Sequence, residues 1–129
     1  MKELKFKAWD NKEQFMVEPF TYGCDSKSKD GYTIYAESLI PSERFSFMQF
    51  TGMFDKNGKE IYDGDIINTE NSGIYSEVEW CRGAGAWVIV EYFVNHPYTF
   101  LSTFDETDIE IVGNIFETPE LLSTKSRVL

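Results

Sequence analysis

The sequence predicts a mainly β protein, a small antiparallel barrel that begins with a β-hairpin and ends with one short helical turn. Three observations carry this prediction. Aromatic residues, which favour strands over helices, make up 16% of the 129 residues. Short runs in which apolar and polar residues alternate recur along the chain. Turn sequences rich in Asn, Asp and Gly separate these runs, as in sheets whose consecutive strands are joined by tight connections.

The first predicted element is a hairpin formed by residues 4–9 and 15–18. Residues 4–9 alternate in strand fashion, and the polar stretch that follows them has turn chemistry. Pro19 has no backbone N–H, so it ends the second strand or marks a sheet edge. Residues 45–50 form the next predicted strand, and a turn is predicted at Thr51-Gly52.

The clearest turn signal in the chain is the segment 55–58, in which Asn57-Gly58 predicts a type I′ hairpin turn with positive φ at both positions. A second tight turn is predicted at residues 63–65. Thr118 is a suitable N-cap and Pro119 fits a first helical position, so the C-terminal helical turn is predicted at residues 118–122. The remaining strands are predicted over residues 59–62, 66–69, 74–80, 86–93 and 109–116.

The length fits a single domain over residues 1–129. Hydrophobic residues make up 42% of the chain, which is enough for a core without disulfides or a structural metal. Within the domain, residues 1–45 are predicted to hold the hairpin and a variable loop. Residues 46–122 are predicted to form the barrel, and residues 123–129 a tail.

The charge balance is strongly acidic, with 22 acidic and 12 basic residues and a net charge of −10. No basic run is longer than two residues, so direct binding to nucleic acid or to an anionic membrane is disfavoured. Cys24 and Cys81 lie far apart and form no CxxC pair, which predicts two free thiols. No apolar stretch resembles a signal peptide or a membrane span, so the expected location is the cytoplasm.

The densest acidic segment holds four carboxylates whose oxygens suit a hard cation such as Mg²⁺ or Ca²⁺, namely Asp55, Glu60, Asp63 and Asp65. The preferred interpretation is that the Asp side chains bond backbone N–H groups of the turns, because no EF-hand pattern is present. His96 has no Cys or His partner at metal-ligand spacing. The glycine-containing stretch 82–85 lacks the Gly-Lys-Ser/Thr ending of a phosphate loop. The sequence therefore predicts no catalytic residue, no cofactor and no metal.

Three segments, taken in order, resemble the YopX family of phage and prophage proteins. They are residues 5–10 (KFKAWD), residues 48–52 and 55–66 (MQFTG and DKNGKEIYDGDI), and residues 111–122 (IVGNIFETPELL). The resemblance implies an SH3-like barrel with an N-terminal extension, a bacterial host cell and self-association, and it implies no reaction. The motif residues expected to serve turns are Asn57, Gly58, Asp63, Gly64, Asp65, Gly113, Asn114 and Pro119.

The aromatic residues are the best lead to a function. The eleven Phe, seven Tyr and three Trp exceed what a small core comfortably holds, so some are expected at an interaction surface. On an SH3-like barrel such residues often line a peptide groove, although core packing is the alternative for most of them. The candidates within or beside predicted strands are Trp9, Tyr62, Trp80, Trp87 and Tyr92.

These observations favour a non-enzymatic accessory protein of phage or prophage origin that acts through protein contacts and forms a homo-oligomer, with a host or phage protein as a further partner. The first alternative is an acidic inhibitor that mimics nucleic acid and binds a host DNA-binding protein. The second is a metal-dependent hydrolase, which would require the carboxylates between Asp55 and Asp65 to converge.

Overall fold

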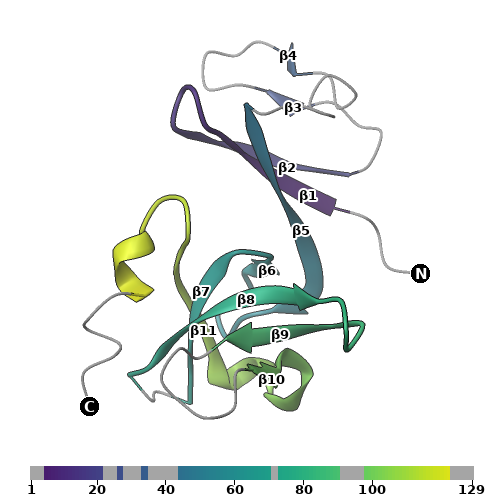
Figure 1. Ribbon diagram of the computed structural model, residues 1–129, viewed down its shortest axis with the longest axis vertical. Helices are drawn as coiled ribbons and strands as arrows, with labels where there is room; N and C mark the ends of the chain where they lie inside the picture. Colours follow the sequence, from purple (N-terminus) through teal and green to yellow (C-terminus); the bar gives the residue numbers. More distant parts are fainter. Residues whose placement is uncertain are drawn as a thin grey trace. The chain divides into compact units, whose positions relative to one another are not determined.

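The computed structural model describes residues 5–21, 26–27, 33–34, 44–70, 73–90 and 98–122 (Figure 1). Its strands are antiparallel, so the predicted mainly β class is confirmed. The chain divides into two compact units, Met1–Phe50 and Thr51–Leu129. Strand β5 (Phe45–Phe54) contributes residues to both units. No helix in the described part of the chain is long and apolar enough to cross a bilayer.

In the first unit, β1 (Lys5–Asp10) pairs with β2 (Phe15–Thr21) on one side and with β5 on the other. Two-residue strands β3 (Ser26–Lys27) and β4 (Thr33–Ile34) pair with each other. The small core contains Ala8 and Val17, which face each other across β1 and β2. Phe6, Phe45 and Phe47 pack against this pair. The rest of the predicted variable loop lies outside the described residues.

The second unit contains a five-stranded sheet with the order β10-β9-β8-β7-β11. Its strands are β7 (Asp65–Thr69), β8 (Tyr75–Cys81), β9 (Ala86–Val90), β10 (Tyr98–Phe100) and β11 (Ile109–Asn114). Strand β6 (Glu60–Tyr62) pairs with β5 instead. The short 3-10 helices are η2 (Leu101–Thr103), η3 (Glu106–Asp108) and η4 (Pro119–Leu122), the last at the predicted helical turn.

One face of the five-stranded sheet carries the core of this unit. Ser76 and Val78 are buried on it, as the alternation over residues 74–80 predicts. Isoleucines dominate the buried cluster because β-branched side chains pack well on a pleated sheet. The cluster consists of Ile61, Ile67, Val78, Ile89, Leu101 and Ile109. These residues come from five strands and η2, so this core fixes the relative positions of the strands within the unit.

Two predicted turns differ from the structure. Strand β5 continues through Gly52, whose φ of 89° bends the strand instead of ending it. The type I′ prediction at residues 57–58 is wrong, because Gly58 has a positive φ and Asn57 does not. The Gly58 N–H donates to the Asp55 carbonyl, and the Asp55 N–H donates to the Lys59 carbonyl. This is the three-residue hairpin loop with a left-handed glycine, which Asn-Gly also permits.

Candidate functional site

The five aromatic residues proposed as an interaction surface occupy different environments. Trp9 is 7% exposed and Tyr62 is 2% exposed, so both rings are buried. Trp87 is half-buried and packs against the core of the second unit. Trp80 is 49% exposed. Tyr92 lies outside the described residues. Among the predicted candidates that the structure describes, Trp80 and Trp87 are therefore the two that solvent reaches.

The hairpin of β8 and β9 brings these two tryptophans together. Trp80 lies opposite Trp87 in the strand register. Their ring centroids are 5.2 Å apart with an interplanar angle of 70°, the edge-to-face arrangement that aromatic pairs prefer. The loop closes with a Gly85 N–H bond to the Cys81 carbonyl, and Gly85 has a positive φ of 64°. The Trp87 ring thus supports an exposed Trp80 ring at the end of the sheet.

A second exposed aromatic pair was not among the predicted residues. Tyr98 and Phe100 on β10 are 41% and 43% exposed, with ring centroids 6.0 Å apart. In the strand register Phe100 lies opposite Val88, the neighbour of Trp87. Because successive strand residues point to opposite faces, this pair lies on the sheet face opposite the tryptophans. We call this the outer face, defined by Glu77, Glu79, Val88, Val90, Tyr98 and Phe100.

The acidic segment between residues 55 and 65 serves the turns, as the preferred interpretation predicts. Asp55 Oδ1 accepts the N–H groups of Asn57 and Lys59 at 2.8 and 2.9 Å. Its Oδ2 accepts the Ile111 N–H at 3.1 Å. Burial alone would raise the pKa of Asp55, but these three donors outweigh it and hold the pKa below its usual value. Asp55 therefore joins the β5–β6 hairpin to β11.

Asp65 and Asn114 close the other two motif turns. Asp65 Oδ2 accepts the Tyr62 N–H at 2.8 Å across the Asp63-Gly64 turn, and Gly64 has a positive φ of 87°. Asn114 Oδ1 accepts the N–H groups of residues 116 and 117 at 3.0 and 2.8 Å. Its own N–H donates to the Thr118 hydroxyl at 3.1 Å, which positions η4 and its first residue, Pro119. The described part of the chain contains no cluster of three acidic, Cys or His side chains able to hold a metal ion.

Asp63 differs from the other turn carboxylates. Burial raises its pKa, and the nearby Glu79 carboxylate raises it further, to about 6. The Gly64 N–H donates to the Val78 carbonyl at 2.8 Å, which places this turn beside β8 and explains the proximity of Glu79. The partial burial of Asp63 and the nearby Glu79 carboxylate both destabilise the ionised form of Asp63. Asp63 therefore lowers the stability of the folded state most at neutral and alkaline pH.

We expect Asp63→Asn to stabilise the protein in a pH-dependent way. Because the folded pKa of Asp63 lies above its ordinary value of 3.8, its stabilising contribution is complete below pH 3.8 and is lost as pH rises through about 6. The free energy of unfolding of the variant should equal that of the wild type near pH 4 and exceed it by about 2 kcal/mol at pH 8. Urea denaturation across this range measures the difference. The exposed Asp108→Asn is the control, and a difference that stays constant with pH would contradict the assignment.

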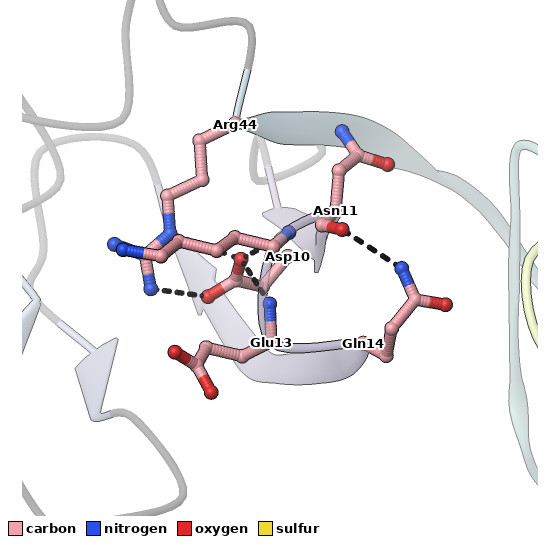
Figure 2. Close-up of polar contacts among 6 residues, drawn as sticks. Asp10, Asn11, Glu13, Gln14 and Arg44 are labelled. Carbon is pink, nitrogen blue, oxygen red and sulfur yellow. Dashed lines mark hydrogen bonds and ion pairs between the residues drawn. The ribbon is translucent and has the colours of Figure 1, made fainter.

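Asp10 forms a separate polar site in the first unit (Figure 2). Arg44 donates to both carboxylate oxygens of Asp10, at 2.9 and 2.7 Å. The Lys12 and Glu13 N–H groups donate to Oδ1 across the β1–β2 turn. The Arg44 hydrogen bond is the main reason that the pKa of Asp10 falls to about 2, with burial opposing it. The carboxylate is fully used in joining the turn to the start of β5, so we assign it a structural role.

Comparison with known proteins then identifies the family. The family model described as YopX protein matches residues 5–123. The chain belongs to the YopX family. This confirms the resemblance drawn from the three sequence motifs, and the match spans the described residues of both units. No enzymatic activity is known for the YopX family. No curated protein matches the chain significantly.

Two solved structures are similar to this YopX-family chain. The crystal structure of protein EF1440 from Enterococcus faecalis has a TM-score of 0.62 at 24% identity, over 93% of this chain and 98% of that one. The crystal structure of yopX from Bacillus subtilis has a TM-score of 0.55 at 16% identity, over 92% of this chain and 98% of that one. At these identities the likeness concerns the fold alone.

Of the two cysteines and the histidine in this YopX-family chain, the structure describes Cys81. Cys81 is a half-buried free thiol at the end of β8. Cys24 and His96 lie outside the described residues, as does the predicted tail over residues 123–129. The sequence signal for the Tyr98–Phe100 pair was the alternation Tyr-Thr-Phe, which places two aromatic rings on one face of a strand.

Proposed function

We propose that this YopX-family protein is a phage or prophage accessory protein without catalytic machinery, which acts through protein contacts and self-association on an SH3-like barrel. The observation that carries the proposal is the exposure of aromatic side chains at the β8–β10 part of the second unit. Aromatic side chains are enriched at protein interfaces, where their area and rigidity contribute most of the binding energy. The motifs shared with phage and prophage proteins support the genetic context.

The Trp80 end of the β8–β9 hairpin is the surface best suited to a second copy of the chain. Trp80 is held edge-to-face on Trp87, which is itself packed on the core, so little side-chain entropy would be lost on binding. The loop beside it contains Gly83 and Gly85, and open space surrounds the Cβ position of both glycines. Two hairpins related by a twofold axis could therefore bring their tryptophans together without obstruction from the loop.

We expect size-exclusion chromatography with light scattering to give a dimer or larger mass at high micromolar concentration. Trp80→Ser should weaken self-association by about 30-fold, the effect of a typical interface hot spot. Phe54→Ser is the matched control, because Phe54 is another exposed aromatic residue of the same unit, on strand β5. A monomeric wild type at several hundred micromolar would refute self-association. Equal effects of both substitutions would refute the assignment to Trp80.

The acidic inhibitor remains a second candidate because of the charge of the strands in the second unit. Strands β7–β10 contain no Lys or Arg, and β8 adds two glutamates, Glu77 and Glu79, to the surface of this unit. Such a surface attracts basic groups of a DNA-binding protein and repels phosphates. Competition with duplex DNA for a basic host protein would test this function, and displacement of the DNA is the expected result.

A further inference from the structure

The outer face combines two features that are separate in the sequence. Tyr98 and Phe100 form an exposed, mutually supported aromatic pair on the edge strand β10. On the same face, two strands away, Glu77 and Glu79 extend from β8. Neighbouring strands lie about 4.8 Å apart, so the carboxylate-bearing strand and the ring-bearing strand are separated by about 10 Å.

The valines of β9 occupy the space between the rings and the carboxylates. In the register Val88 lies between Glu79 and Phe100, and Val90 lies between Glu77 and Tyr98. Val88 is 3% exposed and Val90 is half-buried, so solvent reaches the middle of the face mainly at Val90. The outer face therefore presents two parallel rows, each with a carboxylate at one end, a valine in the middle and an aromatic ring at the other end.

This order of groups matches a cationic ligand with apolar stems. A carboxylate binds an ammonium or guanidinium group through charge-assisted hydrogen bonds, and an aromatic ring attracts the same groups through its π face. The aliphatic stem of a Lys or Arg side chain packs on apolar surface such as the valines. The absence of Lys and Arg from strands β7–β10 means that these strands supply no cation of their own to the face.

We propose that the outer face binds an extended basic segment of a partner protein, with one cationic side chain against Glu79 and the next on the same side of the segment over the ring of Phe100. In an extended chain, alternate side chains point the same way and lie about 7 Å apart, and the long, flexible Lys or Arg stems cover the difference from the roughly 10 Å between β8 and β10. The inference rests on the proposed role in protein contacts, and it is independent of self-association through Trp80.

A nonapeptide of alternating arginine and threonine, labelled with fluorescein, is the probe. Fluorescence anisotropy with the full chain should show binding that Glu79→Gln and Phe100→Ser each weaken by about tenfold, the loss expected for one charge-assisted or cation–π contact. Asp108→Asn and Phe54→Ser are the matched controls, since each removes one carboxylate or one exposed ring elsewhere in the second unit. The controls should change the affinity by less than about twofold.

Methyl signals of Val88 and Val90 provide a second measurement on the wild type, which does not depend on how the variants fold. Both signals should shift as the peptide is added. The proposal would be overturned by the absence of binding at millimolar peptide, or by shifts confined to other methyl groups. It would also be overturned by an equal loss of affinity in all four variants, because that would indicate general attraction to a chain of net charge −10. Light scattering on the same samples reports self-association separately, so either conclusion can fail without the other.

Discussion

Replacing Gly113 with alanine is expected to lower the free energy of unfolding of the second unit by about 3 kcal/mol, the upper range for overpacking. A Cβ at this position on β11 would overlap the Thr118 hydroxyl and would lie 2.8 Å from Leu121 Cδ1. Thr118 cannot move freely, because its hydroxyl accepts the Asn114 N–H and donates to the Asn114 carbonyl. The added methyl group should therefore displace η4 from the sheet.

Gly83→Ala is the matched control for this substitution. Gly83 lies in the β8–β9 loop, no atom comes within 4 Å of its Cβ position, and its φ is not in the left-handed region. Alanine there should change stability by no more than about 0.5 kcal/mol. Urea denaturation followed by circular dichroism measures both variants, and hydrogen exchange of the β11 amides locates the effect. Equal losses of stability in the two variants would show that the close approach of Thr118 and Leu121 is not what excludes a larger residue at position 113.

The sequence was most informative where local chemistry determines the structure. Asp55, Asp65 and Asn114 were predicted to serve turns, and each does so by accepting backbone N–H groups within a few residues. Such bonds depend on short sequence separations, which a single sequence displays directly. The bond from the Ile111 N–H to Asp55 spans 56 positions and could not be predicted in the same way. The Asn57-Gly58 pair fits both a type I′ turn and a loop in which Gly58 alone has a positive φ. The choice between them depends on the register of the flanking strands, which the sequence does not show.

The candidate surface was less predictable, because exposure of an aromatic residue depends on its neighbours in space. Trp9 and Tyr62 lie in strands as Trp80 does, yet both are buried. Trp80 is exposed because it lies at the end of β8, beyond the buried Val78. The outer face combines residues of β8, β9 and β10. The sequence shows which residues alternate within each strand, but it does not show which strands are neighbours. The pairing of strands determined which carboxylates and rings share a face.

Asp55→Ala is the second substitution expected to have a large effect, a loss of about 4 kcal/mol. It would leave the N–H groups of Asn57, Lys59 and Ile111 without their acceptor, and an unsatisfied donor costs roughly 1–3 kcal/mol where it is buried. The loss should be smaller than the sum because water can reach the exposed Asn57 and Lys59. Asp55→Asn should be milder, since its single amide oxygen can still accept two of the three N–H groups.

The pH dependence of the Asp55→Asn variant separates charge from packing. The folded pKa of Asp55 lies below its ordinary value of 3.8, so its contribution is complete above pH 3.8 and is lost as pH falls through the folded pKa. The difference in stability between the wild type and the variant should therefore be constant above pH 3.8 and shrink as pH falls below it. The exposed Asp108, replaced by Asn, is again the control. A difference between wild type and Asp55→Asn that persists undiminished into acid would mean that the three hydrogen bonds do not depend on the ionised carboxylate.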